Sequence, residues 1–228
     1  MKNWWYYYKW YVICGAILIL ILINLIGNAF GWFKKAPDIQ IAYIGKTKLP
    51  EDTVAALENA FASLADDYNH DGETRIQVNQ FVSGSPDAND ADALSYQQAS
   101  MVALMGDINN CESYFFLMET PEDVQKEFQV LAMPDGSCPD DTDFSTDNKV
   151  FQWKTCRSLS EKDLGNYTTT LFGQTKSGSN QELLANLYLG RRCFYNKKHS
   201  RHAEECSELW NTLFYKPEKH KNSVFHHH

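Results

Sequence analysis

The stretch IQIAYIG, Ile39–Gly45, decides the fold together with the two segments that follow it, EDTVAALENAFASLADDY and RIQVNQFV. IQIAYIG and RIQVNQFV are short apolar runs rich in β-branched residues, which is typical of strands. Between them, after Pro50, apolar side chains recur every three or four positions, at Val54, Leu57, Phe61 and Leu64. That spacing predicts a helix. A strand, a helix and a strand in this order predict a parallel βαβ unit, because parallel strands need a crossover connection.

The same alternation continues along the chain. ALSYQQASMVALMGDIN predicts a second helix over 93–109, and SYFFLME predicts a third strand over 113–119. This strand is apolar on both sides, so we expect it near the centre of the sheet. Thr120-Pro121-Glu122-Asp123 then begins a third helix that runs to Leu131. The sequence therefore predicts a three-layer α/β domain with a mostly parallel sheet and crossover helices.

The pattern changes after Leu131. An acidic loop with two prolines covers 133–148, and two further strands, expected to be antiparallel, cover 149–159 and 167–175. QELLANLYLGRRCFY and SRHAEECSELWNTLF predict a C-terminal helical hairpin joined by a basic turn. We therefore assign the domain to 39–216 and expect a disordered tail over 217–228.

The N-terminal segment has the composition of a membrane anchor. No charged residue lies between Lys9 and Lys34, and aromatic residues crowd both flanks. About 20 apolar residues span a bilayer as a helix, and aromatic rings favour its interfaces. This predicts an anchor over 1–33, with a transmembrane helix at about 12–30, and a linker over 34–38. A cleaved signal peptide is the alternative, because Ala29-Phe30-Gly31 has the small residues of a cleavage site.

The order of these elements resembles one family. NWWYYYKWYVI, IAYIG, a D-x-N-x-D-G turn, VNQF and FFLME occur in this order. They are similar to the small membrane-anchored cell-envelope proteins of clostridia-like Gram-positive bacteria, whose exported domain resembles one lobe of a type 2 periplasmic solute-binding protein. The resemblance implies a role in binding a ligand or a partner.

Location and partners follow from charge and topology. A short N-terminal flank before a large acidic domain favours an extracytoplasmic domain on a single-pass membrane protein. The net charge of −8 argues against nucleic acid as a partner, because phosphate contacts need Lys and Arg. The partner classes that remain, besides the membrane, are a small-molecule ligand and a protein.

Any ligand is expected at the C-terminal ends of the parallel strands, where open sheets leave a crevice. The candidate ligand-binding residues there are Gly45, Lys46, Thr47, Ser83, Glu119 and Thr120. The chain contains no G-x-S-x-G or P-loop motif, so a non-catalytic binding module is the favoured function. An accessory subunit of a larger membrane or transporter assembly is the alternative, and an envelope hydrolase is less favoured.

The segment DYNHDGETRI, Asp67–Ile76, resembles the first half of a calcium loop. Asp67, Asn69 and Asp71 occupy the first three ligand positions, and Glu73 would offer its carbonyl oxygen. Val78 stands where an EF-hand has a bidentate Glu, so this is not an EF-hand. Two interpretations remain open: a calcium site completed by another acid, Asp66 or Glu73, and an Asx-rich turn that binds no metal.

The six cysteines leave several alternatives. Cys193 and Cys206 would form a disulfide if the two arms of the predicted helical hairpin brought them together. The same two residues with His199 and His202 offer a zinc ligand set, although the spacing fits no standard finger. Unpaired, buried thiols are the third interpretation.

Overall fold

The computed structural model describes residues 2–29, 35–84, 91–171, 174–195 and 198–214. The chain forms two compact units, Met1–Ala36 and Pro37–His228. The second unit begins inside the predicted linker: Asp38 is buried, and its carboxylate accepts hydrogen bonds from the backbone of Asn69 and Arg75. Residue 34 of that linker and the predicted tail at 217–228 lie outside the described residues.

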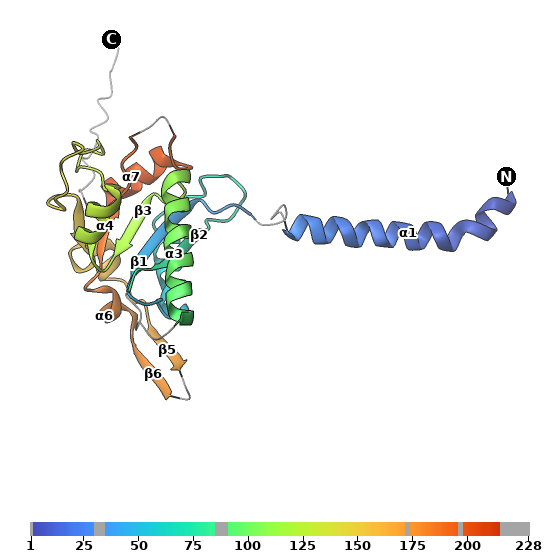
Figure 1. Cartoon of the computed structure of the whole chain (residues 1–228), viewed down its shortest axis with the longest axis horizontal. Coiled ribbons are helices and arrows are strands. Elements are labelled where there is room, and N and C mark those ends of the chain that lie inside the picture. The colour runs from blue at the N-terminus through green and yellow to red at the C-terminus, as the bar shows by residue number, and fades with distance from the viewer. Residues whose placement is uncertain (1, 30–34, 85–90, 172–173, 196–197, 215–228) are drawn as a thin grey trace, which may run out of the picture. The chain divides into compact units, whose positions relative to one another are not determined.

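The second unit is built on a five-stranded sheet in the order β2-β1-β3-β7-β4 (Figure 1). The strands are β1 Ile39–Gly45, β2 Ile76–Val82, β3 Phe115–Met118, β4 Val150–Gln152 and β7 Tyr188–Arg191. β1 pairs in parallel with β2 and β3, whereas β7 pairs antiparallel with β3 and β4. Four strands therefore point the same way and β7 points the opposite way. This confirms the predicted α/β class with a mostly parallel sheet.

Helices cover both faces of the sheet because its side chains are apolar on both sides. The helices are α2 Glu51–Ala62 and α7 Ala203–Phe214 on one face, and α3 Ala91–Asn110 and α4 Pro121–Phe128 on the other. On the first face, Tyr43 and Leu117 pack with Leu57, Phe61 and Trp210. On the second face, Ile44 and Met118 pack with Leu104 and Val124. Successive strand residues point to opposite faces, so β1, β2, β3 and β4 each contribute to both clusters.

The C-terminal half differs most from the prediction. The segment expected as one helix over 181–195 forms a short helix, α6 Asn180–Leu184, and then strand β7. The predicted helical hairpin is therefore wrong in its first arm, while the second arm is helical as α7. A short apolar run does not distinguish a buried strand from a buried helix. Gly190 in this strand packs tightly against Leu131, since a Cβ atom added at position 190 would lie 2.7 Å from Leu131 Cδ2.

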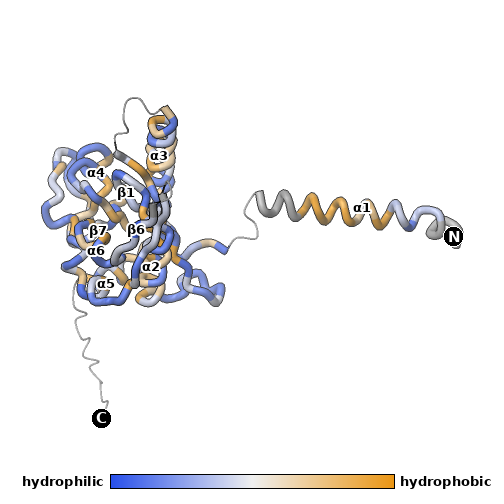
Figure 2. The backbone as a smooth tube through the Cα atoms, turned by 90° about the horizontal axis from the view of Figure 1, so that it is seen from below, coloured by the Kyte–Doolittle hydropathy of each residue, from blue (hydrophilic) through white to orange (hydrophobic). Residues whose placement is uncertain are grey.

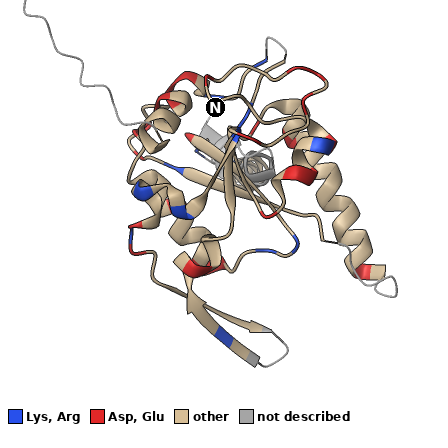
Figure 3. Cartoon of the chain, turned by 90° about the vertical axis from the view of Figure 1, so that its left-hand side faces the viewer, with Lys and Arg blue, Asp and Glu red and all other residues tan. Residues whose placement is uncertain are grey.

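The segment expected as one strand over 167–175 also differs. It contributes to two strands, β5 Asn166–Leu171 and β6 Gln174–Ser179, which form a separate antiparallel sheet. This hairpin projects from the domain in two perpendicular views (Figures 1 and 3). Two short elements, the 3₁₀ turn η1 Trp153–Thr155 and helix α5 Arg157–Ser160, follow β4. Figure 3 also shows that basic and acidic positions are interspersed along the domain.

In the described residues of the first unit, the helix is α1 Lys2–Ala29. Its aliphatic side chains from Ile17 to Ile23 are exposed. Figure 2 shows a continuous hydrophobic stretch of the backbone tube within α1. Within the described part of the chain, no helix has both the length and the apolar character that crossing a membrane requires. The transmembrane helix predicted at about 12–30 is therefore not supported by the described structure.

Candidate functional site

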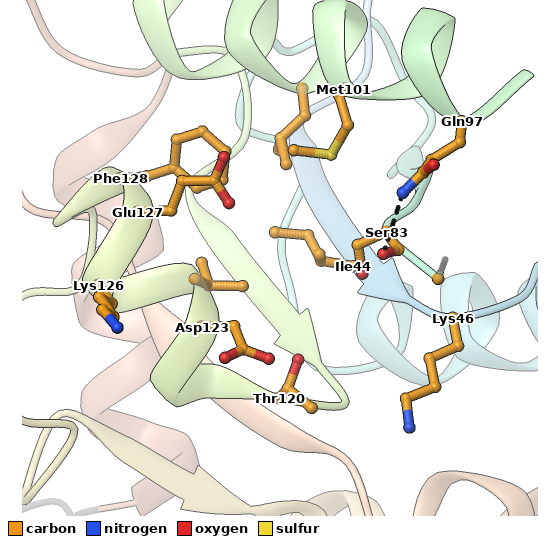
Figure 4. Close-up of a pocket in the computed structure, with 13 residues that line it drawn as sticks. Ile44, Lys46, Ser83, Gln97, Met101, Thr120, Asp123, Lys126, Glu127 and Phe128 are labelled. Atoms are coloured by element: carbon orange, nitrogen blue, oxygen red, sulfur yellow. Dashed lines mark hydrogen bonds between the residues drawn. The ribbon is translucent and has the colours of Figure 1, made fainter. Parts of the chain in front are cut away.

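A pocket lies at the C-terminal ends of β1, β2 and β3, between α3 and α4 (Figure 4). Its volume is about 950 Å³. Its place follows from topology, because the three strands are parallel and end at the same edge of the sheet. The pocket therefore lies at the strand-end crevice that the sequence predicts.

The floor of the pocket is apolar. Ile44 at the end of β1, Leu104 on α3 and Val124 on α4 are almost fully buried beneath it. Met101 and Phe128 are half-buried and extend this surface along the two helices (Figure 4). A ligand that covered these side chains would remove apolar surface from water, which is the main source of affinity in pockets of this kind.

The loops after β1 and β2 form a polar side of the pocket. The backbone N–H of Ser83 donates to the Gly45 carbonyl at 2.8 Å, and the Gln97 amide donates to the Ser83 carbonyl at 3.5 Å (Figure 4). Gly84 lies so close to the first loop that an added Cβ atom would be 2.5 Å from the Lys46 carbonyl oxygen. The backbone in this corner is therefore fixed, while the Lys46 ammonium is exposed.

The opposite side of the pocket is formed by α4. Asp123 and Glu127 lie one turn apart on this helix, and both line the pocket with Lys126 and Thr120 (Figure 4). The pocket thus has one cationic group from the sheet edge, Lys46, and two carboxylates and one ammonium group from α4, above an apolar floor. Of the described residues that line it, none is a histidine or a cysteine. The arrangement offers charged and apolar contacts to a bound molecule.

Three of the six predicted ligand-binding residues line the pocket: Lys46, Ser83 and Thr120. The other three, Gly45, Thr47 and Glu119, do not. The Tyr43 hydroxyl lies 2.8 Å from Glu119 Oε1 and 3.0 Å from the Thr47 carbonyl oxygen. Tyr43 belongs to the opposite face of the sheet, and alternation along a strand explains the split. Burial, followed by the neighbouring Glu119, raises the pKa of Tyr43 above its ordinary value.

Sequence reasoning missed the helical half of the pocket. Gln97, Met101 and Leu104 occupy positions i, i+4 and i+7 of α3, so they share one helix face. Asp123 and Glu127 have the same relation on α4. The helical spacing was available in the sequence, but the side of the sheet covered by each helix was not.

The predicted calcium loop is an Asx-rich turn. Asp67 accepts hydrogen bonds from the backbone of Gly72 at 2.7 Å and Asp71 at 3.2 Å, and Asn69 accepts one from Asp71 at 2.9 Å. Asp71 accepts one from the Glu73 N–H at 3.1 Å. Across the described ranges, no group of three His, Cys, Asp or Glu side chains is arranged to hold a metal ion. These hydrogen bonds are those of an Asx-rich turn, and occupancy of the loop by calcium stays a prediction.

The pKa of Asp67 reflects the hydrogen bonds of this turn. Desolvation acts to raise the pKa of Asp67, but the backbone N–H groups of Gly72, Asp71 and His70 outweigh it and hold the pKa below its ordinary value. The ionised Asp67 carboxylate therefore stabilises the turn through these backbone N–H groups.

The predicted disulfide between Cys193 and Cys206 is not present. All six cysteines lie in described ranges, and each is a free thiol. Cys206 lies on α7 in the core against the first face of the sheet, and burial raises its pKa to about 12. Cys193 follows β7, and its thiol contacts the Gln129 carbonyl oxygen at 3.5 Å. The hairpin that would have paired them does not form.

The histidines of the zinc alternative are engaged elsewhere. The His199 ring packs on Phe194, with ring centroids 4.7 Å apart, and His202 lies 3.8 Å from the Glu205 carboxylate. They do not join Cys193 and Cys206 in a ligand set, consistent with the absence of a metal cluster among the described side chains.

Comparison with protein-family models, with curated protein sequences and with solved structures finds no match for this chain. The resemblance to clostridial cell-envelope proteins and to a solute-binding lobe therefore stays a prediction. The structure itself defines the class: an α/β domain with a pocket at the ends of its parallel strands.

Proposed function

We propose that this chain is a non-catalytic binding module that takes a small amphipathic molecule in the strand-end pocket. The observation that carries the proposal is the pocket itself, in which an apolar floor from two helices and the sheet meets Lys46 on one side and Asp123 on the other. Ligand sites in open α/β sheets occur at this edge. The pocket of about 950 Å³ lies near the upper end of the usual range, so it can enclose most of a drug-sized molecule.

The charges define the ligand class further. A ligand with an apolar body can cover Leu104 and Phe128, an anionic group on it can approach Lys46, and a cationic group can approach Asp123 and Glu127. Amino acids, short peptides and amphipathic amines or carboxylates meet part or all of this description. The predicted resemblance to a solute-binding lobe implies only a role in binding a ligand or a partner, which agrees with this proposal.

We propose that α1 attaches the module to a membrane, with the domain extracytoplasmic. The support is the uncharged run between Lys9 and Lys34 with aromatic flanks, and the exposed aliphatic side chains of α1. Membrane fractions washed with alkaline carbonate test the attachment: the chain is expected to stay in the pellet and to be released by detergent. Release by carbonate alone would contradict the proposal. Protease digestion of intact cells tests the orientation.

Methionine methyl NMR tests ligand binding site by site. The full chain, labelled with ¹³C at its methionine methyl groups and held in lipid nanodiscs, is titrated with four probes: phenylalanine, indole-3-acetate, phenethylamine and hexanoate. Met101 lines the pocket, whereas Met105, one turn further along α3, is 48% exposed and does not line it. Saturable shifts of Met101 with an unmoved Met105 are expected for at least one probe. If no probe moves Met101, or both methyls move alike, the proposed ligand class is wrong.

A second candidate function is supported by α3. Leu94, Val102 and Met105 are exposed on this helix, with fractions of 43%, 70% and 48%, and their spacing places them on one side of it. An exposed apolar stripe of this kind favours the accessory subunit of a membrane assembly. Val102→Glu would then remove the chain from a larger complex on native gels of solubilised membranes, without lowering its melting temperature. An unchanged migration would contradict this alternative.

A further inference from the structure

A buried tyrosine connects two of the loops that form the strand-end pocket. Tyr43 lies on β1, is 1% exposed and belongs to the face of the sheet opposite the pocket. Its hydroxyl lies 3.0 Å from the Thr47 carbonyl oxygen, in the loop after β1, and 2.8 Å from Glu119 Oε1, at the end of β3. The hydroxyl has one proton, so it donates to one of these acceptors at a time. We call these three groups the Tyr43 bridge.

The backbone beside the Tyr43 bridge leaves space for it. A Cβ atom added at Gly45 would overlap the Tyr43 hydroxyl and would lie 2.7 Å from Glu119 Oε1. The Glu119 N–H donates to the Ile44 carbonyl at 3.0 Å, which places Glu119 beside the end of β1. A glycine at position 45 therefore lets the hydroxyl and the carboxylate meet.

Both acceptors of the Tyr43 bridge adjoin residues that line the pocket. Thr47 follows Lys46, and Glu119 precedes Thr120. Lys46 and Thr120 line the pocket, and Figure 4 shows them beyond the ends of β1 and β3. The Tyr43 bridge therefore connects the loop that carries the Lys46 ammonium to the strand end from which α4 begins.

Two further contacts fix the loop that carries Lys46. The Leu49 N–H donates to Gln80 Oε1 at 2.8 Å, which attaches the loop to β2. Gly84 packs against the Lys46 carbonyl group from the loop after β2. Of these attachments, the Tyr43 bridge is the one that reaches β3. The backbone of the loop is thus attached on both sides, whereas the Lys46 side chain is exposed and can contact a ligand.

We propose that Tyr43 and Glu119 are positioning residues that set the affinity of the pocket for the anionic group of its ligand. This inference rests on the proposed function, because it concerns how Lys46 contacts that ligand. Neither residue lines the pocket, so both act through the loop of Lys46. Without the Tyr43 bridge, this loop gains conformational freedom, and a ligand carboxylate must order the loop again when it binds. A cationic group that pairs with the carboxylates of α4 does not depend on that order.

Two probes with aromatic bodies and opposite charges test this role. Indole-3-acetate and phenethylamine are titrated into the full chain in lipid nanodiscs, and each dissociation constant is measured from the Met101 methyl resonance. Tyr43→Phe is expected to weaken indole-3-acetate by about fivefold, the ratio that corresponds to one hydrogen bond, and phenethylamine by less than about twofold. Tyr68→Phe is the matched control, because it removes a half-buried hydroxyl that does not line the pocket, and it is expected to change neither affinity.

Variants of Glu119 test the same contact from its other side. Glu119→Ala is expected to weaken indole-3-acetate as Tyr43→Phe does. Glu119→Gln is expected to bind both probes within about twofold of the parent chain, because its amide oxygen still accepts the hydroxyl proton. Tyr43→Phe and Glu119→Ala remove the same hydrogen bond, so either variant that folds tests it.

A double-mutant cycle with Lys46 separates positioning from a general effect on folding. In a Lys46→Met background the ammonium group is absent, so adding Tyr43→Phe is expected to change the affinity for indole-3-acetate by less than about twofold. A full fivefold effect in that background would overturn the inference, because Tyr43 would then not act through Lys46.

The outcomes distinguish this inference from the proposed function. If the parent chain binds none of the four probes at Met101, the proposed function fails and the inference fails with it. If the parent chain binds phenethylamine but not indole-3-acetate, or if Tyr43→Phe changes the two affinities equally, the positioning role is wrong while the proposed function stands.

Discussion

Asp107 is expected to be among the most stabilising side chains outside the apolar core. Its Oδ1 atom lies 2.8 Å from Arg192 Nη2, and its Oδ2 atom accepts the Ser113 hydroxyl at 2.6 Å. Both ion-pair partners are 3% exposed. Burial lowers the pKa of Arg192, and the Asp107 charge opposes that change. Asp107→Ala would therefore leave a buried guanidinium without its counter-charge, at a cost of about 3–5 kcal/mol.

The loss is measured by urea unfolding of the full chain followed by tryptophan fluorescence. A cost of this size lowers the melting temperature by about 6 to 20 °C for a domain of this length. Glu73→Ala is the matched control, because its ion pair with Arg75 is exposed and is expected to change stability by less than about 1 kcal/mol. The double variant Asp107→Ala/Arg192→Met is expected to be at least as stable as Asp107→Ala, since it removes the unpaired charge. A loss below about 1 kcal/mol for Asp107→Ala would refute the reasoning.

Three further predictions follow from local geometry. Gly190→Ala places a Cβ atom 2.7 Å from Leu131 Cδ2, so we expect a loss of about 1–3 kcal/mol in urea unfolding; an unchanged midpoint would contradict the packing. Folding lowers the pKa of Asp67, so its carboxylate stabilises the domain above the unfolded-state pKa of 3.8. This stabilisation is lost as the pH falls through the folded-state pKa. Asp67→Asn should therefore reduce the dependence of the unfolding free energy on pH in the acid range. A dependence identical to that of the parent would count against the turn. Tyr43→Phe removes the hydrogen bond to Glu119 and is expected to cost about 1 kcal/mol at neutral pH; because the pKa of Tyr43 is raised, the parent chain should lose stability above pH 10 more steeply than the variant. If the unfolding free energies of the parent chain and of Tyr43→Phe fall equally steeply above pH 10 in urea unfolding, the pKa of Tyr43 is not raised by folding.

The N-terminal half of the domain could be predicted from the sequence because local signals and tertiary burial agree there. Ile39–Gly45 is apolar enough for a strand buried on both faces, and the spacing of Leu57 and Phe61 is helical. The C-terminal half could not be predicted in the same way. Tyr188–Arg191 becomes a strand because it lies between β3 and β4, and no short-range pattern specifies that insertion.

Charged residues show the same limit. Arg191 and Arg192 lie in the first arm of the predicted helical hairpin, close to its basic turn, yet both side chains are buried. Their partners, the carbonyls of Met133 and Pro134 and the Asp107 carboxylate, are far away along the chain. A buried charge depends on such distant partners, so its burial cannot be predicted from its neighbours in sequence.

The candidate site was half predictable for a related reason. Lys46, Ser83 and Thr120 follow directly from the rule that parallel strands end at a common edge. Glu119 lies at the end of its strand, as predicted, but does not line the pocket, because its partner Tyr43 belongs to the opposite face of the sheet. The acidic residues of α4 could not be assigned to the pocket from the sequence, because the sequence does not specify which face of the sheet this helix covers.

The dissociation constant of a pocket ligand in two tryptophan variants tests the central claim most directly. Met101→Trp places a large ring in the strand-end pocket, and Met105→Trp places the same ring on the exposed side of the same helix. The ligand is the tightest of the four probes, titrated in lipid nanodiscs and followed by the resonances of the probe. We expect at least about a tenfold weaker affinity for Met101→Trp, which corresponds to about 1.4 kcal/mol, and a change of less than about twofold for Met105→Trp. Equal affinities for the two variants would show that the probe binds elsewhere and that the strand-end pocket is not the binding site.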